Sequence, residues 1–203
     1  MYIPASFAET DPRTLHEFIE QHSFGTLVTR GEEAPDASHI PFLLDRDAGP
    51  NGQLTGHLAR ANPQWKSLED SPVLVIFSGP HSYISPAWYG AQNVVPTWNY
   101  VAVHVYGRVR LVSDNDRLLE ILHRTVDTYE SGRPQPWSLE EPDDDFVRGL
   151  LDAIVGFDIQ IERIEGKWKL NQNHDPERRQ RVVEGLRLAG SSDNKAIADL
   201  MDS

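Results

Sequence analysis

The 203-residue chain contains no cysteine. It therefore cannot form disulfides, thiolate metal centres or iron–sulfur clusters, and it has no cysteine nucleophile. Long apolar segments are also missing, because the longest aliphatic or aromatic run, residues 73–77, is far shorter than the roughly 20 residues that cross a bilayer. The first residues, MYIPASFAET, lack the basic and apolar regions of a signal peptide. We therefore expect a cytoplasmic protein without membrane association.

Positive charge is scarce as well. The 31 acidic residues outnumber the 19 basic ones, which gives a formal net charge of −12. Affinity for nucleic-acid phosphates comes largely from Lys and Arg, so direct DNA binding is disfavoured. Arg178, Arg179 and Arg181 form a candidate basic patch on an expected helix that begins after Asp175-Pro176. We interpret them as a solvated face, or as partners of the acidic stretch 140–145, rather than as a nucleic-acid surface.

Common catalytic motifs are absent too. The sequence contains neither a dinucleotide-binding G-x-G-x-x-G nor a Walker A pattern nor a G-x-S-x-G elbow. His16, Glu17 and His22 lack the i, i+4 histidine spacing of a zinc-protease helix, and we predict no metal site. Ser82 follows His81 directly, but no acidic residue is close in sequence to orient that histidine. A serine–histidine–acid triad would have to be assembled from distant segments.

Alternating hydrophobicity indicates a mainly β protein with peripheral helices. We predict strands over residues 25–29, 37–45, 53–59, 73–77, 97–112 and 157–164, with a turn at Gly166 before residues 167–170 continue. Pro41 places its strand at a sheet edge or at a bulge, because proline cannot donate to a ladder. Six or seven strands with hairpin turns predict a closed or nearly closed antiparallel barrel of the α+β class.

One domain is expected over residues 1–190, since no linker or internal repeat divides the chain. The residues that follow, 191–203, are small and polar, and they predict a mobile tail.

The stretch 79–107 is rich in aromatic side chains, with two Trp and four Tyr. Within the strand 97–112, Val101, Val103 and Val105 share one face, and the other carries Trp98, Tyr100 and Tyr106. The first face suits a core, whereas the second suits an interface or a ligand wall. Trp65, Trp88 and Trp98 could stack on a flat heteroaromatic ligand, or they could simply pack in a core or dimer interface.

The segment GHLARANPQW ends a strand and begins a short helix, with Asn62 as the N-cap and Pro63 at the first position. His57, Arg60 and Asn62 would surround the helix N-terminus. Free backbone N–H groups and a guanidinium form a suitable cradle for a phosphate. The alternative is a surface arginine beside an ordinary helix cap.

Six segments occur in a fixed order: MYIP, HIPFLLD, GHLARANPQW, VIFSGPHSYISPAWY, VPTWNYVAVHVYG and KLNQN. Together they closely resemble the PaiB-type family, described as FMN-binding negative transcriptional regulators. The resemblance extends from Met1 to about Leu188. Two positions depart from the family pattern: Asn171 stands where serine is expected, and His174 stands where a basic residue is usual.

The resemblance implies a split β-barrel of the pyridoxamine-phosphate-oxidase-like class, with FMN bound at the interface of a homodimer. Arg60 would hold the FMN phosphate, and residues 39–42 would run beside the isoalloxazine ring. Gln172 and Asn173 would meet the polar flavin edge or hold their own loop. The full set of implied FMN contacts, some from the second subunit, is His39, Ile40, Pro41, Phe42, His57, Leu58, Ala59, Arg60, Asn62, Trp65, Ser82, Tyr83, Ser85, Trp88, Tyr89, Thr97, Trp98, Asn99, Gln172 and Asn173.

Three functions stay open. The first is an FMN-binding homodimer that acts as a flavin-dependent oxidoreductase or as a redox or ligand sensor, with the flavin supplying the chemistry. No residue is assigned as catalytic, and His57, His81 and Tyr83 are the candidates for proton transfer. The second is a negative transcriptional regulator without a recognisable DNA-binding motif, acting through a partner or a sensed ligand. The third is haem binding or degradation.

Overall fold

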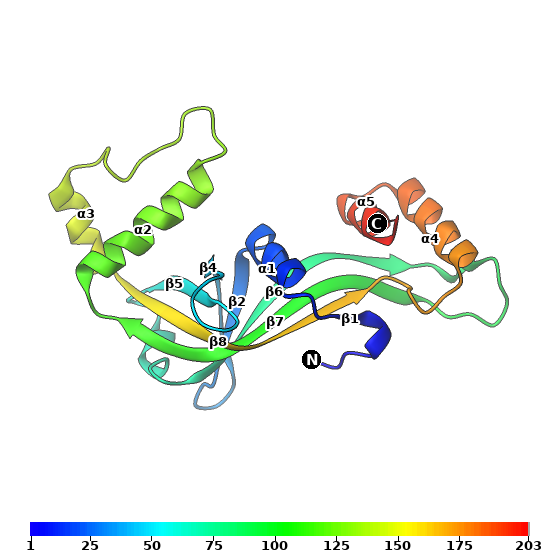
Figure 1. Ribbon diagram of the computed structural model, residues 1–203, viewed down its shortest axis with the longest axis horizontal. Helices are drawn as coiled ribbons and strands as arrows, with labels where there is room; N and C mark the ends of the chain where they lie inside the picture. The colour runs from blue at the N-terminus through cyan, green and yellow to red at the C-terminus, as the bar shows by residue number, and fades with distance from the viewer. Residues whose placement is uncertain (203) are drawn as a thin grey trace. The chain divides into compact units, whose positions relative to one another are not determined.

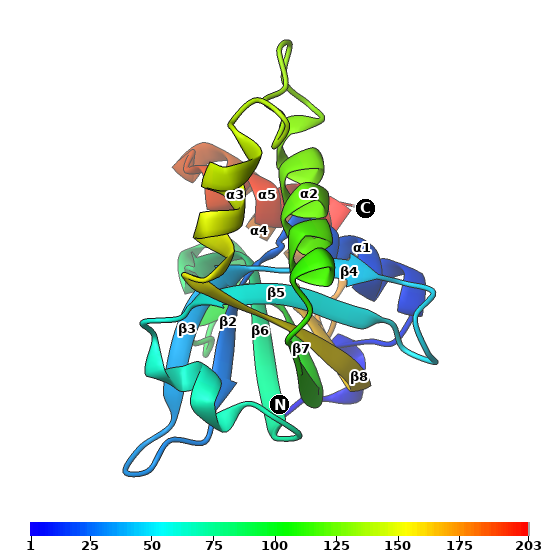
Figure 2. The ribbon, with the colours of Figure 1, turned by 90° about the vertical axis from the view of Figure 1, so that its left-hand side faces the viewer.

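A computed structural model describes residues 1–202 (Figures 1 and 2). The strands are β1 (Ala8–Glu9), β2 (Phe24–Thr29), β3 (Asp36–Pro41), β4 (Leu43–Asp45), β5 (Gln53–Ala59), β6 (Pro72–Ile84), β7 (Thr97–Val112) and β8 (Ile154–Lys169). The helices are α1 (Pro12–Gln21), α2 (Asn115–Glu130), α3 (Asp144–Leu151), α4 (Pro176–Ala189) and α5 (Ser192–Asp202). Three short 3-10 helices are η1 (Ala5–Phe7), η2 (Pro63–Ser67) and η3 (Pro86–Tyr89).

The strands form one eight-stranded sheet in the order β3-β2-β6-β7-β8-β5-β4, and β1 pairs with β8. The registers of β1 to β5 with their neighbours are antiparallel, which confirms the predicted mainly antiparallel α+β class. The edge position of β3, which ends at Pro41, is also confirmed. The chain has more strands than predicted, because the stretch 37–45 breaks at Phe42 and because β1 is only two residues long.

The chain divides into two compact units. Unit 1 comprises Met1–Leu15, Phe77–His104 and Glu165–Ser203, and unit 2 comprises His16–Ile76 and Val105–Ile164. The long strands β6, β7 and β8 contribute residues to both units. Among the described helices, none combines the length and the apolar character needed to cross a bilayer.

Unit 2 has its core between one face of its strands and helix α2. Phe42 and Phe157 are buried and meet edge to face, with 6.3 Å between ring centroids. Gly156 lets α2 approach β8, because a Cβ there would lie 2.7 Å from the Leu118 side chain. Asp114 caps α2 by accepting a hydrogen bond from the Arg117 backbone N–H at 2.9 Å. Figure 2 shows α3 beside α2 in this unit.

Unit 1 has its own core, formed in part by α4 and α5, which lie side by side (Figure 1). The buried side chains of the two helices are Val182, Val183, Leu186, Ile197, Ala198 and Met201. Residues 192–202 therefore form a packed helix where the sequence predicts a mobile tail; residue 203 lies outside the described residues. Ile197 and Met201, at i and i+4, give only a short apolar stripe, which is too brief to predict a helix among small polar residues.

Gly166 does not form the predicted turn, because β8 continues through it. Its register partner is Glu9 of β1. A Cβ at this position would lie 2.3 Å from Leu15 Cδ2 and 3.0 Å from the Glu9 carbonyl oxygen. The glycine is thus needed for the close approach of neighbouring chain rather than for a change of direction.

Candidate functional site

Arg60 lies at the surface of unit 2, in the loop that joins β5 to η2. Its Nε donates to the carbonyl oxygen of Asp152 at 2.6 Å, and its Nη2 donates to the carbonyl oxygen of Ile154 at 2.8 Å. The Trp65 ring centroid lies 5.9 Å from Arg60 Cζ, and Trp65 Nε1 donates to the Arg60 carbonyl at 2.9 Å. The two carbonyls use only part of the N–H donors of a guanidinium. Arg60 is thus fixed in place and retains donors for an anion.

Asn62 is the N-cap of η2, as predicted. Its Oδ1 accepts from the Gln64 backbone N–H at 3.0 Å, and its Nδ2 donates to Ser38 Oγ at 2.8 Å. Ser38 Oγ donates to Gln64 Oε1 at 2.5 Å, and Gln64 Nε2 donates to Thr29 Oγ1 at 2.9 Å. The backbone N–H of Gln64, which the phosphate-cradle interpretation leaves free, is therefore capped. Contact between Asn62 and FMN stays a prediction.

The exposure of the side chains falls along the segment 39–42, which the resemblance places beside the flavin ring. His39 is exposed; its Nδ1 lies 2.9 Å from Thr26 Oγ1, and its ring stacks on Phe24 with 6.5 Å between centroids. The two residues before Phe42 are half-buried, and Phe42 itself is only 2% exposed. Only the first part of this segment therefore presents side chains to a ligand at the surface.

The end of β5 shows the same alternation. Leu58 is buried, Ala59 is exposed and His57 is half-buried. Burial lowers the pKa of His57 below its ordinary value of 6.5, which favours a neutral imidazole at neutral pH.

Unit 1 carries an exposed aromatic face on β6 and β7, defined by His81, Tyr83 and Trp98. Trp98 is 53% exposed and Tyr83 is 47% exposed. Their rings meet edge to face at 6.1 Å between centroids, and His81 stacks on Trp98 at 5.9 Å. His81 Nδ1 lies 3.2 Å from Asp193 Oδ2. Adjacent exposed rings of this size are typical of an interaction surface.

Two of the predicted FMN contacts on these strands are buried instead. Ser82 Oγ donates to Asn194 Oδ1 at 2.6 Å, and Asn99 Nδ2 lies 3.4 Å from Met201 Sδ. Both side chains contact residues of α5, a helix that the sequence does not predict. Asn99 Oδ1 has no hydrogen-bond partner among the described residues.

The predicted contacts in η3 are packed against α4. Ser85 caps η3 through its Oγ, which accepts from the Ala87 N–H at 3.3 Å. Tyr89 is buried, and Trp88 is half-buried beside Gly185, where a Cβ would lie 2.4 Å from the indole ring. These residues therefore hold α4, and their contact with FMN stays a prediction.

A cavity of about 420 Å³ opens in unit 1 between η3, the start of β7, the end of β8 and the start of α4. Three predicted FMN contacts line it, namely Tyr89, Thr97 and Asn173. The structure brings them together with Lys169, which donates to Thr97 Oγ1 and to the Trp98 carbonyl. Burial lowers the pKa of Lys169, and nearby Lys167 lowers it further.

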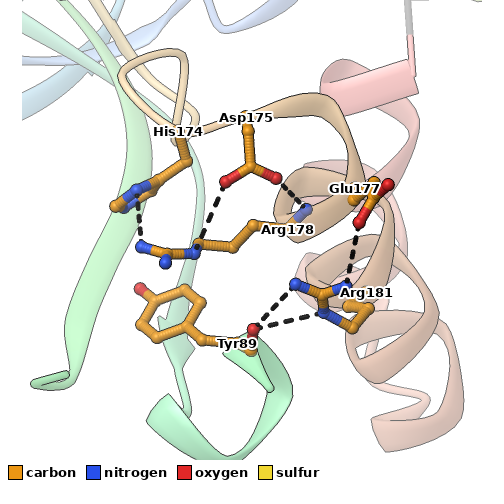
Figure 3. Close-up of polar contacts among 6 residues, drawn as sticks. All are labelled: Tyr89, His174, Asp175, Glu177, Arg178 and Arg181. Carbon is orange, nitrogen blue, oxygen red and sulfur yellow. Dashed lines mark hydrogen bonds and ion pairs between the residues drawn. The ribbon is translucent and has the colours of Figure 1, made fainter. Parts of the chain in front are cut away.

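Other polar residues that line the cavity, Arg178 and His174 among them, are not in the predicted set of FMN contacts. Arg178 lies over the Tyr89 ring, with 5.6 Å from Cζ to the centroid, and its Nη1 is 3.2 Å from His174 Nδ1 (Figure 3). Arg178 Nε is 3.9 Å from Asp175 Oδ2. Burial and then Arg178 lower the pKa of His174. Two features of the sequence point to these residues: the departure of Asn171 and His174 from the family pattern, and the basic patch that contains Arg178.

The arginine cluster is only in part the solvated face that the sequence predicts, because Arg181 alone of the three is exposed. Arg178 and Arg179 are half-buried, and Arg179 Nη2 donates to the Met201 carbonyl at 2.8 Å. Arg181 donates from Nε and Nη2 to the Tyr89 carbonyl at 3.2 and 3.0 Å (Figure 3). Arg178 and Arg181 therefore hold α4 on η3, and Arg179 holds α4 on α5, which a helical pattern alone does not reveal.

Gln172 holds its own loop, the second of the two roles considered for it. Its Oε1 accepts from the Leu170 N–H at 2.8 Å, and its Nε2 donates to the Trp168 carbonyl at 2.5 Å. Next to it, Asn171 has a left-handed backbone with φ of 60°. Asparagine adopts this conformation far more readily than most side chains, which explains the asparagine at this position.

The fold of the chain is similar to that of two solved structures. A structure described as the flavocytochrome Anf3 from Azotobacter vinelandii matches with a TM-score of 0.61 at 20% identity, covering 85% of this chain and 74% of that one. A structure described as the FAD and heme binding protein from Mycobacterium smegmatis matches with a TM-score of 0.58 at 16% identity, covering 91% and 80%. At these identities the likeness concerns the fold alone, and it confirms the predicted split barrel.

The chain belongs to the family described as "Putative FMN-binding domain", which matches residues 1–163. It is also 38% identical to "Protease synthase and sporulation protein PAI 2" of Bacillus subtilis (strain 168) over 203 residues, covering 100% of this chain and 97% of that protein. An uncharacterized protein of Aspergillus fumigatus is 32% identical, covering 98% and 95%. The resemblance to the PaiB-type family is thus confirmed, and FMN is the cofactor.

The residues present fit such a cofactor. FMN needs a partner for its phosphate and flat apolar surfaces for its ring. Unit 2 offers the fixed and exposed guanidinium of Arg60, and unit 1 offers the exposed rings of Tyr83 and Trp98. A guanidinium binds phosphate through charge-assisted hydrogen bonds, and aromatic rings stack on a planar ligand.

Proposed function

We propose that the protein is a homodimer that binds FMN at the interface between its two copies. The observation that carries this proposal is the exposed pair Tyr83 and Trp98, because rings of this size are seldom left together in water without a partner. Unit 2 adds a second exposed pair, Phe24 (66% exposed) stacked on His39. Covering such rings contributes about 25 cal/mol per Å² of apolar surface removed from water.

Arg60 is the proposed phosphate ligand. Its two backbone carbonyl contacts restrict the guanidinium before any ligand arrives, which reduces the entropy lost on binding. Trp98 and Tyr83 would supply flat walls and exclude water from the ring. When bound, FMN supplies electron-transfer chemistry, and the protein contributes orientation and electrostatics. We propose a redox or ligand-sensing role for this arrangement.

His57, His81 and Tyr83 are the proposed proton-carrying groups. The lowered pKa of His57 favours a neutral ring, which can donate from one nitrogen and accept at the other. His81 is held by Asp193, and Tyr83 is exposed beside Trp98. An exchange of protons with a bound substrate needs groups of this kind.

A regulatory role is compatible with the same protein and would act indirectly. The net charge of −12 opposes contact with DNA phosphates, so we propose that regulation proceeds through a partner or a sensed ligand. We also propose a cytoplasmic location, which the absence of cysteine supports.

Calorimetric titration with FMN and with riboflavin tests the FMN site, because their difference isolates the phosphate. We expect FMN to bind more tightly, and Arg60→Ala to weaken FMN by about 1.5–3 kcal/mol while leaving riboflavin unchanged. Arg133→Ala, which removes another exposed arginine in unit 2, is the control and should change neither affinity. Equal affinities for FMN in the wild type and in Arg60→Ala would remove the phosphate assignment.

Size-exclusion chromatography with light scattering measures the molecular mass of the protein in solution and tests the homodimer. A mass of one chain at all concentrations would rule out the dimer. An absorption spectrum after addition of haem separates the haem alternative, because a Soret band would indicate haem binding in place of FMN.

A further inference from the structure

The cavity of unit 1 has a lining unlike the rest of the protein. The chain as a whole carries a net charge of −12, yet none of the described residues that line this cavity is Asp or Glu. Lys169 and Arg178 both line it. The nearest acid in contact with them, Asp175, is exposed, caps α4 and lies 3.9 Å from Arg178 Nε. The cavity is therefore a local positive site in an acidic protein.

Two residues that line the cavity have donors that make no hydrogen bond within the described chain. Asn171 is only 2% exposed and its Nδ2 has no hydrogen-bond partner among the described residues. The same holds for Arg178 Nε. Buried donors are normally paired, and each exception calls for an explanation such as an absent ligand. A buried amide donor without a hydrogen bond, beside a guanidinium whose Nε makes only a 3.9 Å ion pair, indicates a ligand with acceptor oxygens.

Another part of the lining is apolar. Phe7, Val94 and Val95 line it, and Val95 is 75% exposed. The volume of about 420 Å³ falls within the range of small-molecule sites. A ligand that suits both the polar and the apolar parts of the lining has an anionic head and a compact apolar body.

We propose that this cavity is a second ligand site, that Tyr89, Thr97 and Asn173 serve it in place of FMN, and that it binds a small carboxylic acid with an apolar body. The carboxylate accepts from Asn171 and Arg178, and the apolar body packs on Val94, Val95 and Phe7. Arg178 suits this role because a guanidinium matches the geometry of a carboxylate. Its packing on the Tyr89 ring orients it before the ligand arrives.

Binding at this site involves no covalent step, and it is independent of FMN. The site contains Tyr89 and α4, which Arg181 ties together, so an occupied cavity would fix η3 against α4. The protein would then respond to the concentration of the acid.

Benzoate, benzamide and acetate are suitable probes, titrated by calorimetry into the full chain. Benzoate should bind, and benzamide, its neutral analogue, should bind at least about tenfold more weakly because it lacks the charge. Acetate should also bind at least about tenfold more weakly, because it lacks the apolar body. Equal affinity for benzoate and benzamide, or no heat with benzoate at millimolar concentrations, would overturn the proposal.

Two variants of Asn171 locate the site. Asn171→Asp places a negative charge in the lining of the cavity and should abolish benzoate binding. Asn171→Gly removes the donor but accepts the backbone φ of 60°, and it should weaken benzoate by about threefold to tenfold. Asn115→Asp, at the start of α2 in unit 2, adds the same charge elsewhere and should leave benzoate binding unchanged. Unchanged binding by both Asn171 variants would place benzoate elsewhere and overturn the proposal.

A titration of benzoate into FMN-saturated protein tests whether the sites are separate. We expect the same benzoate affinity as without FMN. Competition between the two would show that the cavity is part of the flavin site, and it would overturn the second site while leaving FMN binding intact. If FMN itself does not bind, the benzoate result on the protein alone still decides this proposal.

Discussion

The loop after β5 carries Asn62 and Arg60, whereas the loop after β8 carries Asn171 and the first turn of α4 carries Arg178. The polar groups of these two segments are used differently. In the first loop, both ends of the Asn62 amide are bound by protein, and Arg60 lies at the surface on two carbonyls. In the second, the Nδ2 of Asn171 and the Nε of Arg178 have no hydrogen-bond partner in the described part of the chain. In the first loop the asparagine amide is fully used by the protein, whereas in the second the asparagine is buried and its Nδ2 has no hydrogen-bond partner among the described residues.

This difference shows that a sequence motif can locate a loop correctly without showing whether the hydrogen-bond donors of that loop are free to bind a ligand. The motif GHLARANPQW correctly locates a strand end and a helix cap, yet the cap uses the amide group expected to meet a phosphate. The motif KLNQN gives little indication of an anion site, because its cationic partner Arg178 is supplied by the next helix. Recognition of an anion depends on which donors the rest of the protein leaves unused.

The largest expected effect comes from disturbing the packing of η3 against α4, which leaves the polar groups of the loop after β8 unchanged. Gly185→Ala would place a Cβ about where the Trp88 ring lies, at 2.4 Å. We expect the free energy of unfolding to fall by about 1–3 kcal/mol, although alanine is the better helix former. Gly149→Ala in α3, where nothing lies within 4 Å, is the matched control and should raise stability by about 0.5–1 kcal/mol. Urea denaturation measures both, and a loss in both variants would contradict the packing account.

The two asparagines provide the sharpest contrast. Asn62→Ala removes a cap and the bond to Ser38, and we expect it to lower the free energy of unfolding by about 0.5–2 kcal/mol. Asn171→Gly removes an amide whose Nδ2 is unpaired and keeps the left-handed backbone, so stability should change by less than about 0.5 kcal/mol. Denaturant titrations compare the two. Equal losses would mean that the two loops are equally satisfied.

A smaller effect is expected on the exposed aromatic face. Trp98→Ala should weaken FMN by about 0.5–1.5 kcal/mol and reduce dimer formation, because it removes a stacking wall. Trp137→Ala, which removes another exposed tryptophan in unit 2, should change neither property. Fluorescence titration with FMN and sedimentation measure the two effects. If both variants behave like the wild type, Trp98 does not face the flavin.

Acid should weaken both units to a modest extent. Burial lowers the pKa of His22 and His57 in unit 2 and of His104 and His174 in unit 1, all from an ordinary value of 6.5. The unfolded chain therefore binds more protons near and below that pH, so stability falls as the pH drops through 6.5. Denaturation at about pH 7.5 and about pH 5.5 should show the lower stability at the acid value. A rise at the acid value would contradict the buried, neutral histidines.

The sequence predicts β7 with the same bounds as the structure, because its alternation of buried and exposed side chains is regular. It predicts only residues 73–77 of β6, since the strand continues through Gly79 and Pro80, which are weak strand formers. Helix α5 is unpredicted because its buried side chains are few and their partners lie in α4. Local pattern therefore predicts elements whose periodicity is strong and misses those stabilised by tertiary contacts.

The residues of the candidate site also fall into two groups: those that the sequence locates correctly and those whose surroundings depend on tertiary contacts. The predictions at Arg60 and Trp98 concern residues that the structure leaves at the surface, and both stay open to an FMN contact. Ser82 and Asn99 are buried against α5 instead, which no motif could indicate. The cavity beside Asn171 joins segments that are far apart in the sequence, so only the fold reveals it.

The most direct test of the account compares two variants with two ligands. FMN and benzoate are titrated into Arg60→Ala and into Asn171→Asp, with the wild type as the reference. The account predicts that Arg60→Ala loses affinity for FMN alone and that Asn171→Asp loses affinity for benzoate alone. A loss of both ligands in either variant, when the circular dichroism spectrum is unchanged, would contradict two separate anion sites.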